Sequence, residues 1–146
     1  MSQSARQKGD PVLDQIWAQH VELHKRVRAL ANTLEDGGTI ADVIAALARL
    51  RETLPEHFAL EERGGYFSLV LEAAPDLRPR ADVLQGHHGE FLASSSAIQK
   101  SLEELPDCPE TKAYARTRIS ELIGALEAHE AAENQLVRTA LDRAES

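Results

Sequence analysis

Apolar residues that recur in steps of three and four constrain this chain more than any other feature. Such steps place side chains along one face of an α-helix. Turn signals rich in Gly, Pro and Asp interrupt the pattern at "EDGGT", "AAPDLRP" and "LPDCPET". The pattern predicts helices over residues 11–35, 40–73, 80–104 and 109–143. Because the connections are short, we expect an all-α, up-down-up-down antiparallel four-helix bundle over residues 11–143.

Two further features concern the start of the chain and the start of the second helix. Residues 1–10, "MSQSARQKGD", have no apolar pattern and are predicted to form a disordered N-terminal lead. Thr39 with Asp42 three residues later resembles the start of the second helix.

Each apolar seam is interrupted near its middle by one histidine or by one histidine–glutamate pair. The interrupting residues are His20 in the first helix, His57 and Glu61 in the second, His88 in the third, and His129 and Glu133 in the fourth. Since each occupies a core-facing position, the bundle would bring four imidazoles and two carboxylates into its interior.

The interruptions belong to an internal repeat. Aligning His20 with His88 also aligns the apolar seams that surround them, and aligning His57 with His129 matches Glu61 with Glu133. The chain therefore reads as two helical-hairpin repeats. The first helix of each hairpin offers one histidine, and the second offers His-x-x-x-Glu.

Left without partners, such a cluster would be costly. An unsatisfied buried polar group costs about 1–3 kcal/mol, and a buried ion costs more. A pair of divalent metal ions would use the imidazole nitrogens and carboxylate oxygens as ligands, and this donor set without thiolate suits iron, manganese or zinc. The alternative is a hydrated polar layer that specifies helix register in a metal-free structural or interaction bundle.

Other residues near the cluster are candidates for accessory roles. His24 lies one turn beyond His20 and could fill a vacant metal position, while His87 adjoins His88 on the third helix. Glu62 and Glu90 are interpreted as solvated groups or as partners that orient a ligand imidazole. The repeat alignment pairs His24 with Leu92 and His87 with Gln19, which favours an accessory role for both histidines.

Several residues are given structural interpretations. Trp17 and Phe58 are predicted to pack in the core or along a seam, and Tyr66 either packs there or hydrogen-bonds near the cluster. Pro55 should kink the second helix, and Gly64–Gly65 should loosen it. We hypothesise that both features widen the bundle around the metals and open a path for a small molecule.

Composition limits the classes of partner. The formal net charge of −8 is the wrong sign for binding nucleic acid or an anionic membrane. No apolar run is long enough to span a membrane. The single cysteine, Cys108, cannot form an internal disulfide and is interpreted as incidental, which favours a cytoplasmic location.

The motifs "QHVELH", "HFALEE", "GHHGEF" and "HEAAEN" resemble those of the hemerythrin-like (HHE cation-binding) domains, over residues 12–140. The resemblance implies a four-helix bundle with a non-haem di-iron centre and an oxo or hydroxo bridge. It assigns His20 and His57 to one iron and His88 and His129 to the other, with Glu61 and Glu133 as bridging carboxylates. Members of the family bind or sense dioxygen, handle iron, or respond to nitric oxide and peroxide.

The chain departs from the oxygen-carrying members at one position. Those members have His-x-x-x-His on the third helix, whereas Leu84 and Leu92 flank His88 here. The pattern is closer to members with two histidines per iron, which are associated with iron sensing and iron–sulfur cluster repair. We therefore expect a protein that binds or senses a small diatomic ligand or iron itself. The alternative is a di-iron oxidoreductase that turns over peroxide or nitric oxide.

Overall fold

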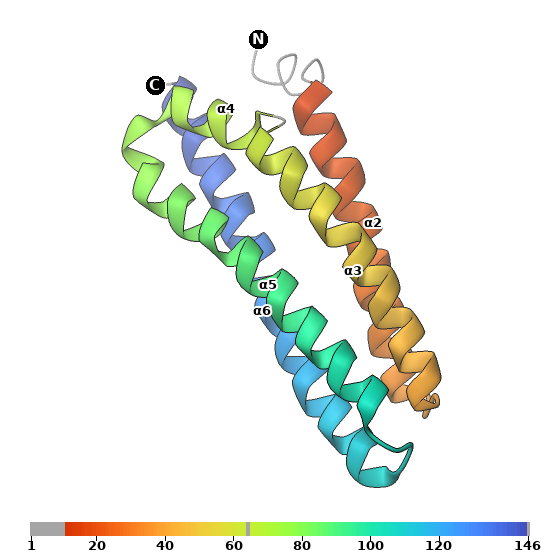
Figure 1. Cartoon of the computed structure of the whole chain (residues 1–146). Helices are drawn as coiled ribbons and strands as arrows, with labels where there is room; N and C mark the ends of the chain where they lie inside the picture. The colour runs from red at the N-terminus through yellow and green to blue at the C-terminus, as the bar shows by residue number, and fades with distance from the viewer. Residues whose placement is uncertain (1–10, 64, 146) are drawn as a thin grey trace.

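The computed structural model describes residues 11–63 and 65–145, and within them every regular element is a helix. The elements are α2 (Pro11–Glu35), α3 (Ile40–Arg63), α4 (Tyr66–Ala73), the 3₁₀ turn η1 (Pro75–Leu77), α5 (Arg78–Glu104) and α6 (Pro109–Glu145). The four long helices alternate in direction, with α2 beside α3 and α5 beside α6 (Figure 1). This confirms the predicted all-α four-helix bundle. The predicted disordered lead lies outside the described residues.

The connection between α2 and α3 shows how local chemistry sets a helix boundary. Gly37 has a positive φ of 73°, which ends α2 in a conformation that suits glycine. The backbone N–H of Asp42 donates to Thr39 Oγ1, and the N–H of Thr39 donates to Asp42 Oδ2, both at 3.1 Å. This reciprocal pair satisfies two otherwise unpaired N–H groups at the start of α3.

The prediction of one continuous helix over residues 40–73 is wrong. α3 ends at Arg63, and α4 begins at Tyr66 after Gly65, whose φ of 103° lies outside the helical region. Pro55 lies inside α3, so the proline does not end the helix, and α4 starts only after Gly65. Beyond the break, α4 packs against α6 at the end of the bundle where α2 begins and α6 ends (Figure 1).

The core consists of two apolar clusters with a polar layer between them. The larger cluster includes Leu23, Leu54, Phe91 and Leu126. The smaller includes Ile16, Tyr66, Leu84 and Leu136. On α2, α5 and α6, the histidine or histidine–glutamate pair lies in sequence between a residue of one cluster and a residue of the other, and the pair on α3 lies between Leu54 of the larger cluster and Tyr66 of the smaller one, at the start of α4. The apolar clusters therefore enclose the polar layer from both ends of the bundle.

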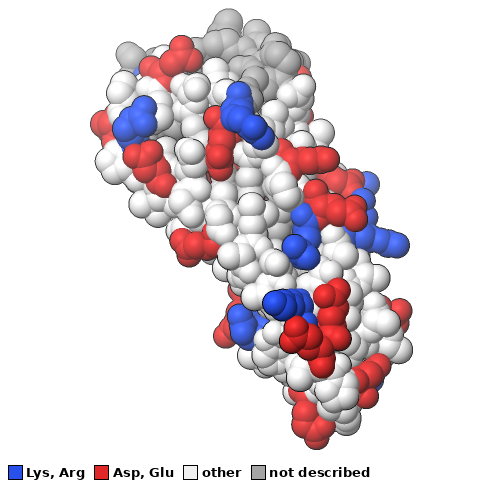
Figure 2. Space-filling model, in the orientation of Figure 1, with Lys and Arg blue, Asp and Glu red and all other residues white. Residues whose placement is uncertain are grey.

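The surface carries charges of both signs. Acidic and basic side chains are interspersed on the face shown in Figure 2. No helix in the described part of the chain combines the length and apolar character needed to cross a bilayer.

Trp17 is 65% exposed, so the prediction that it packs in the core is wrong. It follows the buried Ile16 by one residue, and this turns its side chain about 100° away from the seam.

We expect alanine substitutions at two glycines to have opposite effects. Gly65→Ala should lower the free energy of unfolding by about 1–2 kcal/mol, because a side chain is strained at positive φ. Gly124→Ala is the control and should raise it by about 0.5–1 kcal/mol, because Gly124 lies within α6 with nothing near its added Cβ. Urea unfolding of the metal-free protein measures both. A neutral or stabilising Gly65→Ala would show that the break in the chain does not depend on glycine.

Candidate metal centre

Six side chains meet in the polar layer, and they are the same histidines and glutamates that interrupt the apolar seams of the sequence. They are His20 from α2, His57 and Glu61 from α3, His88 from α5, and His129 and Glu133 from α6. All six residues are buried, and both glutamates have 0% of their surface exposed. Four different helices therefore have to be packed correctly before the cluster exists.

The cluster divides into two groups of four that share both glutamates. His20, His57, Glu61 and Glu133 form one group, and Glu61, His88, His129 and Glu133 form the other. Within each group, one nitrogen or oxygen atom from every residue lies within 4.8 Å of the others. Either group could hold a metal ion, and the shared carboxylates lie where they could bridge two ions.

The distances within the two groups are unequal. His57 Nε2 lies 3.2 Å from Glu61 Oε2, and His88 Nε2 lies 3.0 Å from Glu61 Oε1. His129 Nε2 is 2.9 Å from Glu133 Oε2. His20 Nε2 is farther away, at 3.8 Å from a carboxylate oxygen of each glutamate.

Most of the atoms that face the centre have no hydrogen bond, although they are close together. Unpaired atoms include the Nε2 atoms of His20, His57 and His88, both oxygens of Glu61, and Oε1 of Glu133. Buried polar atoms are normally paired, because each unpaired one costs about 1–3 kcal/mol. Imidazole nitrogens and carboxylate oxygens are also the donors that iron, manganese and zinc accept. The residues present therefore fit a pair of metal ions.

Proximity strongly changes the acidity of the buried groups. Burial lowers the pKa of His88, but the carboxylates of Glu133, Glu61 and Glu62 outweigh it and raise the pKa from 6.5 to about 10. Burial raises the pKa of Glu61, but the surrounding histidines outweigh it and hold the pKa well below its usual range. In the metal-free protein, the proton on His88 therefore offsets part of the negative charge of Glu61.

Three of the histidines are also held at their outer nitrogen. His88 Nδ1 donates to Glu62 Oε2 at 2.6 Å, which is the contact that an orienting role for Glu62 would need. His57 Nδ1 donates to Gln19 Oε1 at 3.2 Å. His129 Nδ1 lies 3.3 Å from His87 Nδ1, within hydrogen-bond distance. These contacts direct the Nε2 atoms toward the centre of the cluster.

Gln19 was not predicted to have a role, although the internal repeat places it in a position equivalent to that of His87. The alignment that pairs His20 with His88 also pairs Gln19 with His87, and the two residues contact equivalent histidines. Glu130 was missed as well. It is half-buried on α6, burial raises its pKa, and it interacts electrostatically with His20 and His57.

Other predicted residues lie outside the cluster. His24 is exposed and belongs to neither group of four, so the structure does not bring it to the metal positions. Glu90 is also exposed. Tyr66 is buried and donates from its hydroxyl to the backbone carbonyl of Glu133 at 3.0 Å, joining α4 to the helix turn that carries this glutamate. Cys108 lies 3.3 Å from Thr111 Oγ1.

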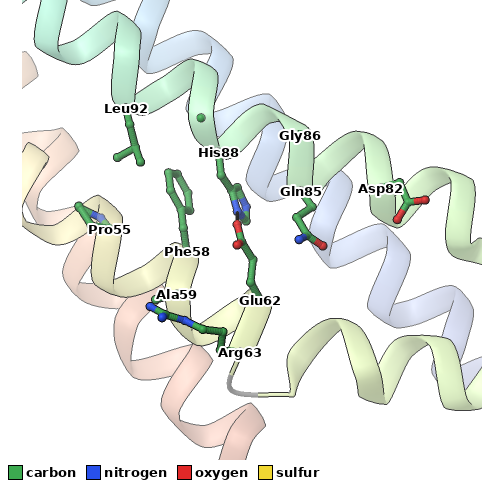
Figure 3. Close-up of a pocket in the computed structure, with 11 residues that line it drawn as sticks. Pro55, Phe58, Ala59, Glu62, Arg63, Asp82, Gln85, Gly86, His88 and Leu92 are labelled. Carbon is green, nitrogen blue, oxygen red and sulfur yellow. Dashed lines mark hydrogen bonds and ion pairs between the residues drawn. The ribbon is translucent and has the colours of Figure 1, made fainter.

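Two hollows reach the cluster from opposite pairs of helices. The α3–α5 groove, about 650 Å³, is lined by residues that include Pro55, Glu62 and His88 (Figure 3). The α2–α6 cavity, about 440 Å³, is lined by residues that include Trp17, His20 and Asn134. A small molecule could therefore approach the cluster beside either of the lone histidines.

Comparison with known protein families agrees with this geometry. Residues 11–141 match the family model described as the hemerythrin HHE cation-binding domain. The chain belongs to this family. The resemblance inferred from the motifs is thereby confirmed, and the buried histidine and glutamate groups fit a metal-binding protein. Comparisons with curated proteins and with solved structures gave no match.

We expect the metal-free protein to be most stable between about pH 4.5 and pH 6.5. His88 binds its proton more tightly in the folded chain, so its contribution is complete below pH 6.5 and is lost as pH rises toward about 10. Glu61 has the opposite shift, so its contribution is complete above about pH 4.5 and is lost as pH falls.

The urea midpoint of the metal-free protein, measured from about pH 5 to about pH 9.5, tests the expected loss of stability above pH 6.5. His88→Ala should flatten the fall above pH 6.5, whereas His24→Ala, at an exposed histidine, should leave it unchanged. A midpoint that stays constant from pH 6.5 upward would contradict the assigned proton on His88.

Proposed function

We propose that this chain binds two iron ions and uses them to bind or sense a small ligand such as dioxygen, nitric oxide or peroxide, or iron itself. His20 and His57 would hold one ion, and His88 and His129 the other, with Glu61 and Glu133 shared between them. The observation that carries this proposal is the pair of four-residue groups with both carboxylates in common. A structural polar layer has no need for such sharing.

The donor count supports a ligand-binding role. Each ion would receive two imidazoles and a share of two carboxylates, and open coordination positions are typical of iron sites that react with small molecules. Bound iron supplies Lewis acidity and one-electron chemistry at these positions. The α2–α6 cavity beside His20 and the α3–α5 groove beside His88 offer approach routes for a small ligand. The exposed Trp17 lines the α2–α6 cavity.

The protein contributes charge balance and exclusion of bulk water. Glu61 and Glu133 bring two negative charges into a layer enclosed by apolar clusters, and these charges attract divalent cations strongly where the dielectric constant is low. Phe58 stacks on the His88 ring, with 3.9 Å between ring centroids, and Phe91 lies edge-on to His129. These rings cover the histidines on the side of the larger cluster.

The first test is metal content together with an optical spectrum, on protein purified without oxygen and then exposed to air. We expect about two irons per chain and new near-ultraviolet absorption on aeration. Glu133→Ala removes a shared ligand and should abolish the absorption, whereas His24→Ala should retain both irons. If the purified protein contains manganese or zinc, iron is the wrong metal in this proposal, and the metal centre itself stands. No bound metal, even after anaerobic iron loading, would refute the proposal.

Addition of nitric oxide or peroxide to the iron-loaded protein separates binding from turnover. A spectral change that saturates at one ligand per iron pair, without steady-state consumption, supports a binding or sensing protein. Continuous consumption of either molecule would identify an enzyme with the same centre.

A substitution at His57 distinguishes the metal centre from a structural polar layer. His57→Leu should lower the urea midpoint of the metal-free protein, because it removes one of the histidines that hold the buried Glu61 ionised. The same variant should lose the stabilisation that added metal gives the wild type. An equal effect of metal on both proteins would show that His57 is not a ligand.

A further inference from the structure

The two hairpins place different residues around their lone histidines. In the repeat, His88 on α5 corresponds to His20 on α2. The residues Phe58 and Glu62 on α3 correspond to Glu130 and Asn134 on α6. The ligand pattern is thus duplicated, but the surroundings of each lone histidine are not.

His88 is held in place from two directions. Phe58 stacks on its ring with an angle of 5° between the ring planes. Glu62 reaches from α3 to His88 Nδ1, and Figure 3 shows both side chains directed at the same imidazole. The hydrogen bond fixes the proton on Nδ1 and leaves Nε2 as the metal-facing atom, and the carboxylate increases the basicity of the ring.

His20 has weaker support. Its Nε2 lies 3.8 Å from each carboxylate, whereas His88 Nε2 lies 3.0 Å from Glu61 Oε1. Its ring has an edge contact with Trp17, which is itself largely exposed. Asn134 occupies the position equivalent to Glu62 and carries no charge. His20 would therefore have to be drawn in and ordered when a metal binds, which lowers the affinity.

We propose that Glu62 makes the two metal positions unequal, so that the chain binds its first divalent ion at His88 and His129 and its second, more weakly, at His20 and His57. This inference rests on the proposed function. Glu62 acts as a positioning residue, through His88, and touches neither ion. A one-ion form would then exist at low metal concentration, and the ion pair would be completed only as iron becomes plentiful. The inequality would make occupancy of the centre responsive to iron supply.

Titration of the metal-free protein with Co²⁺ tests the assignment, because bound Co²⁺ has a visible spectrum and a chelating dye can compete for it. Two binding steps alone do not decide the question, since repulsion between ions also separates them. The repeat-equivalent variants His20→Ala and His88→Ala decide it. His20→Ala should keep the first step and lose the second, and His88→Ala should weaken the first step at least ~10-fold.

A second pair of variants isolates Glu62. Glu62→Ala should weaken the first step by roughly 10–100-fold, the usual effect of removing a partner of a ligand histidine. Asn134→Ala is the repeat-equivalent control and should change neither step. Glu62→Gln, which keeps an acceptor but removes the charge, should fall between Glu62→Ala and the wild type. Both positions are partly or fully exposed, and circular dichroism should show unchanged helix content.

The possible results separate this inference from the proposed function. A first step that survives in His88→Ala but is lost in His20→Ala would overturn the assignment, and so would equal effects of Glu62→Ala and Asn134→Ala. In both cases the protein still binds two ions, and the proposed function stands. If the wild type binds neither Co²⁺ nor Fe²⁺, the proposed function itself fails.

Discussion

The structure depends on the contact between two buried glutamates and the four histidines that surround them. Glu61 and Glu133 are fully enclosed, and neither could remain ionised there without nearby positive charge. The proton on His88 provides part of that charge in the metal-free protein, and metal ions would provide it in the loaded one. Because the six side chains come from four helices, the contacts within the cluster also fix the relative position of those helices.

The break after α3 contributes to this arrangement. Gly65 allows the chain to leave the helix, so that α4 can pack against α6. Tyr66, the first residue of α4, then donates its hydroxyl hydrogen to the backbone carbonyl of Glu133. One glutamate of the centre is thereby supported by the residue that follows the break. A continuous helix over residues 40–73 would carry Tyr66 elsewhere, and the smaller apolar cluster would lose one of its largest buried side chains.

The repeat accounts for the symmetry of the six clustered residues, while the surroundings of those residues break that symmetry. Gln19 and His87 occupy equivalent positions and contact His57 and His129, respectively. Glu62 and Asn134 are also equivalent in the repeat, but only Glu62 is hydrogen-bonded to a lone histidine. The repeat supplies two similar groups of potential ligands, and differences at neighbouring residues give each group its own surroundings.

The sequence alone determined the helical fold and the identity of the six clustered residues. Both follow from periodicity, because steps of three and four define a buried face, and a histidine on that face has no ordinary partner. The repeat also contained the equivalence of Gln19 and His87, although their roles were not evident from it. The ligand roles of the six residues, the metal and its ligand stay predictions.

Tertiary structure decided what depends on contacts between helices. The exposure of Trp17 reflects how α2 lies against its neighbours, and the contact between Glu62 and His88 requires α3 and α5 to pack side by side. The site of the break was also decided there. Pro55 and Gly64–Gly65 both disfavour a regular helix, and helix propensity does not tell at which of them the helix is interrupted. The packing of α4 against α6 decides this. Side-chain pairs between distant segments leave no periodic signal, because the geometry that joins them exists only after the helices have packed.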